Sequence, residues 1–322
     1  MAGLNERGVS ARVWDLSLAT EADVLRDVAA ARPWLVHAFH ALRAGPLAAE
    51  LARRLRVPYV VTLTGTDVNH DLVEPDTTAT VRRVLNGAAA ITVFHHSIAA
   101  RLTGALPAAS PRVVEIPQAV RFERRDPVDL GASWTMPEDR LLVLFPGGIR
   151  RVKNPLVVLR GLQRVVARHP RVMLAYVGPI LEPAEGKALL DALLARPWAR
   201  YLGSIPHTQM AALLAQADVV VNSSVSEGGM ANSVLEALAL GRAVLASAIE
   251  GNRSLIEHEV TGLLFHDEAE LTAQAERLVS DPALRARLGA AGRARIERDY
   301  PPRREIDAYL ALYRSLGVPP PR

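Results

Sequence analysis

Short apolar runs alternate along this chain with longer segments of helical periodicity, and this alternation constrains the fold more than any other feature. It predicts βα units and a parallel sheet. In the first half we expect strands at 11–16, 34–39, 59–63, 90–94 and 112–116, with helices at 45–55 and 77–86. In the second half we expect strands at 141–145, 172–177, 200–203, 218–222 and 243–246, with helices at 154–168, 208–215 and 232–240.

The length of 322 residues suits two domains better than one. The strands of the second half are continuously apolar, which implies burial on both faces. We therefore expect an α/β protein with two Rossmann-like, doubly wound domains, whose strand ends face each other across a cleft. The first domain is expected over 1–125 and the second over 126–302, with a C-terminal helical segment, 303–322, packing back on the first. The polar, proline-bearing segment 121–139 is interpreted as the linker.

Composition narrows the possible functions. A formal net charge of +4 suits an anionic ligand, but the arginines are scattered and aromatic residues make up 5%, which argues against a nucleic-acid partner. No cysteine is present, so disulfides and thiolate metal sites are excluded. No apolar run reaches about 18 residues and no signal peptide is visible. We expect a cytoplasmic protein without a transmembrane segment, for which peripheral membrane contact stays open.

The most informative stretch is NSSVSEGGMANSVLEALALG at 222–241, which reads as a strand, a glycine-containing loop and a helix. Glycines let a ligand approach the backbone, and the amides and macrodipole at a helix N-terminus favour a diphosphate. Two residues of this stretch, Asn232 and Ser233, stand where an N-cap is expected. The residues expected to bind the ligand are Gly228, Gly229, Met230, Ala231, Asn232 and Ser233.

Two glutamates accompany this loop and helix. Glu236 falls one turn inside the helix, where its carboxylate can accept hydrogen bonds from two ribose hydroxyls. Glu227 lies on the loop, where it can contact a sugar. Either glutamate alone would be interpreted as a solvated carboxylate. The neighbouring glycines and the helix start favour a binding role instead.

A second cluster, PGGIRRVKNP at 146–155, follows the first strand of the second domain. The loop around Gly148 supplies amides, and Arg150, Arg151 and Lys153 supply positive charge for a pyrophosphate. A departing nucleotide diphosphate gains negative charge, and a preorganised cation stabilises it. Such cations can replace a metal ion, and no Asp-x-Asp pair is present to bind one. We expect no metal site and no cofactor other than the nucleotide-linked substrate.

Together these motifs resemble the two-glutamate signature of family 4 glycosyltransferases, which have the GT-B fold. The likeness continues through segments 249–252, 258–265 and 278–284. Within the family it is greatest to the group called glycosyltransferase 1 domain-containing protein 1, on the runs NSSVSEG at 222–228 and TGTDVN at 64–69. The resemblance covers the second domain almost entirely and the first domain loosely.

The resemblance implies a retaining, metal-independent enzyme that moves a sugar from a nucleotide diphosphate donor, of the UDP or GDP type, to an acceptor that the sequence does not identify. Two carboxylates flanking the scissile bond are not evident. A front-face reaction, in which the departing phosphate takes the acceptor proton, is therefore favoured over double displacement.

Individual site residues are also implied by the resemblance. Lys153 and an arginine neutralise the diphosphate, and Gly178 ends a strand beside the donor. Ile205 and Pro206 contact the base. In the first domain, His40 and Asp67 are the candidates for contact with the transferred sugar.

This sequence departs from the family pattern in three places. Eight residues separate Glu227 from Glu236 where the family has seven, and the glycine pair at 228–229 accounts for the extra residue. Gly148 occupies the usual arginine position, so Arg150 or Arg151 is expected to substitute for it. The chain begins where the family has the end of its first helix, so we expect the first domain to lack its N-terminal strand.

Two other functions fit these features. One is a nucleotide-sugar-binding protein or scaffold without catalysis, and the other is a different GT-B enzyme, such as a sugar epimerase or a phosphorylase. No motif matches the pyridoxal-phosphate lysine that a phosphorylase of this fold requires. Hydrolysis of the donor distinguishes an enzyme from a binding protein, and the identity of the product distinguishes the enzyme classes.

Overall fold

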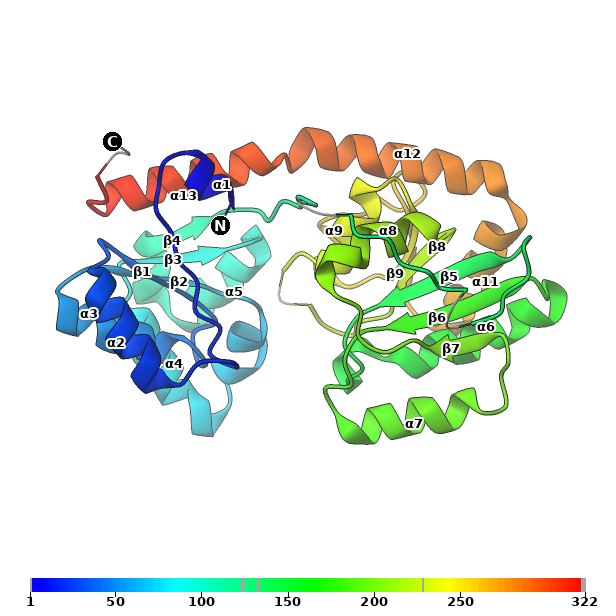
Figure 1. Ribbon diagram of the computed structural model, residues 1–322, viewed down its shortest axis with the longest axis horizontal. Coiled ribbons are helices and arrows are strands. Elements are labelled where there is room, and N and C mark those ends of the chain that lie inside the picture. Colours follow the sequence, from blue (N-terminus) through cyan, green and yellow to red (C-terminus); the bar gives the residue numbers. More distant parts are fainter. Residues whose placement is uncertain (1, 123–124, 132–133, 228, 320–322) are drawn as a thin grey trace. The chain divides into compact units, whose positions relative to one another are not determined.

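The computed structural model describes residues 2–122, 125–131, 134–227 and 229–319 (Figure 1). The chain divides into two compact units. Unit 1 comprises Met1–Ala119 together with Pro301–Arg322, and unit 2 comprises Val120–Tyr300. The chain thus enters unit 2 a few residues before the predicted boundary at 125, and the C-terminal helical segment is part of unit 1. Among the described residues of the predicted linker 121–139, none lies in a helix or a strand.

Unit 1 contains a four-stranded parallel sheet whose order follows the chain. Its strands are β1 (Val36–Phe39), β2 (Tyr59–Thr62), β3 (Ala90–Val93) and β4 (Val113–Glu115). The connecting helices are α3 (Gly45–Leu55), α4 (Pro75–Gly87) and α5 (His96–Ala105), with short helical turns at Asp67–Asp71 and Pro107–Arg112. Right-handed crossovers that all proceed in one direction place their helices on one face of the sheet. The buried side chains of α3, α4 and α5 accordingly share one apolar cluster with the strands.

The opposite face of this sheet is covered by the end of the chain. Helix α13 (Pro302–Ser315) packs Tyr309 and Leu312 against Val60 and Ala90. Polar contacts reinforce this packing, because His37 on β1 contacts the Tyr313 hydroxyl through Nδ1 at 2.7 Å and the Thr62 hydroxyl through Nε2 at 2.7 Å. Two further helices complete the unit. Helix α1 (Ala2–Glu6) contacts α13, and α2 (Glu21–Ala31) packs on α3.

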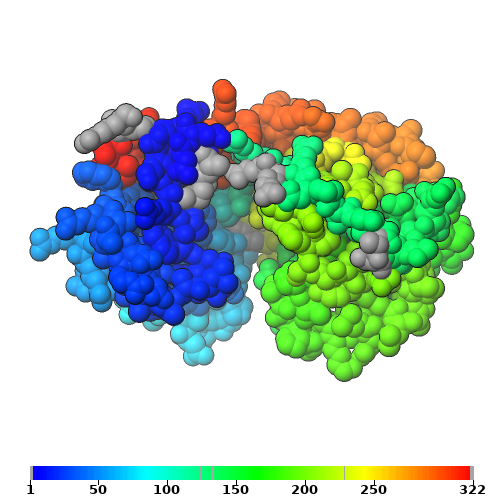
Figure 2. All heavy atoms as spheres, viewed as in Figure 1, coloured from blue at the N-terminus to red at the C-terminus, as the bar shows by residue number. Residues whose placement is uncertain are grey.

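The strand predicted at 11–16 is wrong. Its residues have no strand partner, and Val13 and Leu16 are 67% and 37% exposed. Figure 2 shows this early part of the chain, in dark blue, on the surface of unit 1. A strand requires a neighbour to satisfy its backbone N–H and C=O groups, which apolar composition alone does not supply. The other strands predicted in this half are present within a few residues of their expected bounds.

Unit 2 contains a six-stranded parallel sheet in the order β10-β9-β8-β5-β6-β7. Its strands are β5 (Leu141–Pro146), β6 (Val172–Val177), β7 (Ala199–Tyr201), β8 (Val219–Asn222), β9 (Ala243–Ser247) and β10 (Leu263–Phe265). The chain runs outward from β5 toward β7 on one side and from β8 toward β10 on the other. This is the predicted doubly wound order, and its switch point lies between β5 and β8. The three-residue strand β10 was not predicted.

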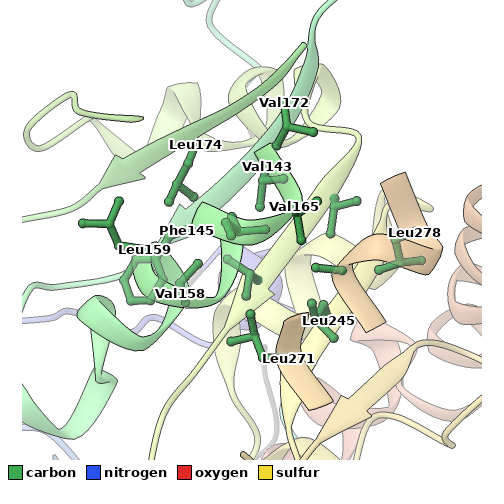
Figure 3. Packing of buried hydrophobic residues seen from close by; sticks show 14 of the residues in the cluster. Val143, Phe145, Val158, Leu159, Val165, Val172, Leu174, Leu245, Leu271 and Leu278 are labelled. Atoms are coloured by element: carbon green, nitrogen blue, oxygen red, sulfur yellow. The ribbon is translucent and has the colours of Figure 1, made fainter. Parts of the chain in front are cut away.

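Helices complete both faces of the unit 2 sheet, and they are α6 (Pro155–Arg168), α7 (Pro183–Leu193), α8 (His207–Gln216), α9 (Asn232–Ala239), α10 (Glu250–Arg253), α11 (Glu268–Ser280) and α12 (Pro282–Asp299). Side chains of β5, β6, α6 and α11, among them Val143, Leu174, Val158 and Leu271, converge in one core (Figure 3). This core fixes the strand ends from which the site loops emerge. Among the described residues, no helix has both the length and the apolar character needed to cross a membrane.

Replacing Tyr309 by Ala should destabilise unit 1, because the side chain is only 9% exposed and its removal leaves a cavity between α13 and the sheet. We expect a loss of about 3 kcal/mol in the free energy of unfolding. Hydrogen exchange of the β2 and β3 amides measures it. The control Leu18→Ala removes a side chain of unit 1 that is 87% exposed, and should change stability by no more than about 0.5 kcal/mol. Equal losses in both variants would contradict the role of α13.

Acid should weaken unit 1 through His37. Burial lowers the pKa of His37 to about 4, from the ordinary value of 6.5 expected in the unfolded chain. Between these pH values the unfolded chain binds more protons at His37 than the folded protein does. The free energy of unfolding therefore decreases as the pH falls from 6.5 toward 4. Between pH 7 and pH 4, wild type should lose on the order of 2–3 kcal/mol more than His37→Gln. Urea titrations at both pH values test this, and parallel losses would disprove it.

Candidate functional site

The site lies at the switch point of unit 2, where strands β5 and β8 pair in parallel. Both strands end at the same edge of the sheet, so the loops that follow them are neighbours. The loop after β5 contains a short 3₁₀ turn, Arg151–Lys153, and the loop after β8 contains Glu227. Crevices beside such switch points are the usual ligand sites of open α/β sheets.

A direct ion pair joins these two loops. The Lys153 ammonium contacts Oε1 of Glu227, and the two side chains are only 16% and 12% exposed. The same carboxylate oxygen accepts a hydrogen bond from the Ser224 hydroxyl at 2.6 Å and from Nδ2 of Asn222 at 3.4 Å. Four polar groups from two separate segments therefore meet at one point.

The backbones of the two loops are also connected. The Val225 amide donates to the Val152 carbonyl at 2.9 Å. The Ser223 hydroxyl lies 2.9 Å from the carbonyl oxygens of Lys153 and Asn154. These contacts hold the Lys153 turn against the end of β8, so the position of the ammonium does not depend on its flexible side chain alone.

Helix α9 extends the site toward Glu236. It begins at Asn232 with Ala231 as the N-cap residue and without a side-chain cap, so the predicted cap at Asn232 and Ser233 is wrong. Burial of Val234 on the core side fixes the helix phase, and the Ser233 hydroxyl instead accepts a hydrogen bond from Nδ2 of Asn222 at 3.3 Å. Asn222 thereby links the Glu227 carboxylate to the first turn of α9.

Glu236 lies one turn further along α9 and is 15% exposed. Burial raises the pKa of its carboxyl, and the charge of the facing His207 imidazole opposes that rise. Nε2 of His207 is 4.0 Å from Oε1 of Glu236. His207 is the first residue of α8, directly after Ile205 and Pro206, so the predicted base-contacting loop lies beside the predicted ribose-binding glutamate.

The loop after β6 approaches the loop after β5 at two glycines. Gly178 has a φ of +140°, and a Cβ there would lie 2.3 Å from the Gly147 carbonyl oxygen. Only glycine fits this conformation and this approach. The Gly178 amide donates to the Gly203 carbonyl at 2.9 Å, which ties in the loop after β7. Gly148 is less constrained, because a Cβ there would meet Cδ1 of Leu181 at 2.6 Å, the end of an exposed side chain that can move.

The two arginines of the β5 loop differ in their surroundings. Arg150 is half-buried, and its Nε atom is buried without a hydrogen-bond partner among the described residues. Arg151 has an exposed side chain, and its backbone amide donates to Oε2 of Glu182 at 2.9 Å. Arg150 therefore retains donor capacity that the described part of the protein does not use.

In unit 1, Asp67 is fully buried at the start of a helical turn. Its carboxylate accepts hydrogen bonds from the amides of Ala41 at 3.0 Å, Gly65 at 2.8 Å and Thr64 at 3.1 Å. Backbone amides from two loops thus engage both oxygens. Asp67 fixes the loops after β1 and β2, and its contact with a sugar stays a prediction.

His40 follows β1 in a left-handed conformation, with φ of +89°. Its Nδ1 accepts hydrogen bonds from the amides of Leu42 and Arg43, so in the neutral ring Nε2 carries the proton. Nε2 is buried, has no hydrogen-bond partner among the described residues, and lies 3.7 Å from Oδ2 of Asp71. The ring therefore presents an unused N–H group.

The remaining predicted residues divide by location. Gly229 has a φ of +141°, and Met230 and Ala231 are buried at the start of α9. Gly228 lies outside the described residues. Over the described ranges, no group of three or more His, Cys, Asp or Glu side chains is arranged to bind a metal ion. Sequence reasoning missed the roles of Asn222, Ser224 and His207. For Asn222 and Ser224, the available signal was the polar Asn-Ser-Ser run that follows the apolar residues 219–221.

Comparisons with known proteins identify the family and the fold of the chain. The family described as glycosyl transferases group 1 matches residues 130–295, and the glycosyl transferase 4-like domain matches residues 3–119. The glycosyltransferase 1 domain-containing protein 1 of Xenopus tropicalis is 30% identical over 270 residues, which cover 82% of this chain and 78% of that protein.

Solved structures share the fold. Anabaena HepE, crystallised with UDP-glucose, superposes with a TM-score of 0.76 at 18% identity, over 97% of this chain and 88% of that one. Sucrose-phosphate synthase from Thermosynechococcus elongatus superposes with a TM-score of 0.73 at 23% identity, over 92% and 77%. These likenesses confirm the predicted fold class, two Rossmann-like domains of the GT-B type. The matched family model and the Xenopus relative show that the chain belongs to the glycosyl transferase group 1 family.

Proposed function

We propose that this protein transfers a sugar from a UDP-sugar to an acceptor, with retention of anomeric configuration and without a metal ion or other cofactor. The observation that carries the proposal is the meeting of Lys153, Glu227 and the first turn of α9 at the switch point of unit 2. UDP is preferred over GDP because HepE, which shares the fold, was crystallised with UDP-glucose.

Lys153 is the cation proposed for the diphosphate. Only two of the chain's 38 basic residues are lysines, so a lysine here departs from a strong preference for arginine. The second cation is proposed to be Arg150, because its half-buried guanidinium has an unused donor, whereas the Arg151 side chain is exposed. Amides at the start of α9 add donors and the positive end of a helix dipole.

Glu236 is proposed to hold the ribose. An ionised carboxylate can accept hydrogen bonds from both ribose hydroxyls. Burial disfavours the ionised form, and the nearby His207 restores part of it. Ile205 and Pro206, which directly precede His207, are proposed to contact the base.

From unit 1, His40 is proposed as the group that contacts the transferred sugar. A buried N–H group without a partner is costly, and such groups persist where a ligand supplies the acceptor. Asp67 is the weaker candidate because backbone amides already engage both of its oxygens.

The proposed reaction takes place on one face of the sugar. The bond from the anomeric carbon to the diphosphate oxygen breaks, and a bond from the same carbon to the acceptor oxygen forms. The acceptor proton passes to the departing phosphate, whose growing charge Lys153 and Arg150 stabilise. Each positive group acts more strongly in the transition state than in the ground state, as catalysis requires.

Charge reversal at Lys153 should abolish nucleotide binding. In a panel of UDP-, GDP- and ADP-sugars, a ligand at about a hundred times its dissociation constant adds roughly 2.7 kcal/mol to the stability of wild type. Lys153→Glu should show no shift in melting temperature with the UDP-sugar. The control Lys187→Glu makes the same charge change at the chain's other lysine, which is exposed on α7, and should keep the shift. A normal shift in Lys153→Glu would show that the phosphates bind elsewhere.

The configuration of the product should be retained, and chelation should not stop the reaction. Wild type incubated with UDP-α-glucose and EDTA should slowly transfer glucose to water. Proton NMR, recorded before the anomers of glucose interconvert, should detect the α-anomer first. An initial β-anomer would contradict retention, and a reaction halted by EDTA but rescued by Mg²⁺ would contradict metal independence. Tight binding without any turnover would favour the non-catalytic alternative.

A further inference from the structure

The cation assigned to the diphosphate is already engaged by a carboxylate of the same protein. Lys153 and Glu227 form an ion pair in which both side chains are largely buried. The Lys153 ammonium carries a single positive charge, so a diphosphate that binds there competes with Glu227 for that charge. Binding at this position is therefore an exchange of one anion for another.

Such an exchange leaves Glu227 without its counter-ion. A largely buried charge that loses its partner is costly, because water does not replace the lost interaction. The Ser224 hydroxyl and the Asn222 amide still contact the carboxylate, but both are neutral donors. A ligand that takes Lys153 binds more tightly if it also supplies donors to Glu227.

A nucleotide sugar meets both requirements, whereas a nucleoside diphosphate meets one. The diphosphate of the donor can pair with Lys153, while the hydroxyls of its sugar can donate to Glu227. The nucleoside diphosphate that remains after transfer has the same anion but no sugar hydroxyls. We propose that Glu227 is an exchangeable counter-ion of Lys153, through which the site favours the intact donor over the spent nucleotide and expels the latter. This inference rests on the proposed function.

The surrounding backbone permits this exchange by rotation of one side chain. Before Glu227, the Val225 amide is bonded to the carbonyl of Val152. After Glu227, the backbone packs on α10 at Gly251, where a Cβ would lie 2.1 Å from the Gly229 carbonyl oxygen and 2.7 Å from Cβ of Glu227. The glycine at 251 allows this close packing. With the backbone held on both sides, only the side-chain torsions of Glu227 need to change.

The variant Glu227→Gln tests the inference, because it removes the charge and keeps the shape. Calorimetric titration should give a dissociation constant for UDP roughly tenfold or more below that of wild type, since UDP no longer displaces a carboxylate. UDP-glucose should gain less or lose affinity, so the wild-type preference for UDP-glucose over UDP should narrow. Unchanged or weaker UDP binding would overturn the inference.

Two controls separate this effect from general changes in charge. Glu182→Gln removes a charge from the neighbouring carboxylate that contacts the Arg151 amide, and should leave the ratio of the two affinities unchanged. In a Lys153→Met background, Glu227→Gln should bring no gain in UDP affinity, because the pair no longer exists. Should Glu227→Gln fold poorly, Glu227→Asp shortens the side chain while keeping its charge, and should raise UDP affinity by a smaller factor.

The binding measurements also distinguish failure of the proposed sugar transfer from failure of the exchange at Glu227. If wild type binds neither UDP nor UDP-glucose, nor the matching guanosine or adenosine ligands, the proposed function fails. If wild type binds both uridine ligands and Glu227→Gln leaves their ratio unchanged, only the exchange fails.

Discussion

The ion pair between Lys153 and Glu227 is the interaction on which the site depends. The two residues are 74 positions apart in the chain, yet both follow central strands of one sheet. Parallel pairing of β5 with β8 brings these strand ends together, and burial of Val143, Val219 and their neighbours fixes the pairing. The apolar core thus sets the separation of two charges that lie outside it.

Burial of apolar surface also explains why the C-terminal helix α13 packs on the sheet of unit 1. Four strands in sequential order, joined by right-handed crossovers, leave one face of the sheet without connecting helices. Helix α13 supplies the missing layer through Tyr309 and Leu312. Unit 1 therefore cannot bury both faces of its sheet from residues before Ala119 alone, and the last segment of the chain belongs to it by packing rather than by sequence position.

Periodicity and composition predict the elements of this fold whose local sequence pattern is strong enough. Continuous apolar runs such as Val172–Val177 are strands with the expected bounds, because few other structures bury every side chain. Segment 11–16 mixes apolar residues with Arg12 and Asp15 and has no partner strand, and β10 is too short to give a pattern. In the site, the sequence assigns Lys153 to the diphosphate and Glu227 to the sugar. Their contact with each other depends on strand order, which no local pattern encodes.

The identity of the cation follows from the same geometry. An arginine has a planar fork that can contact a carboxylate and a phosphate at once, so it would let Glu227 and a diphosphate share one side chain. A lysine offers a single compact charge, so pairing with one anion weakens pairing with the other. In a chain that uses arginine at nearly every basic position, the lysine at 153 is the residue type that makes the two partners compete. The choice of lysine and the presence of the carboxylate are thus two parts of one electrostatic arrangement.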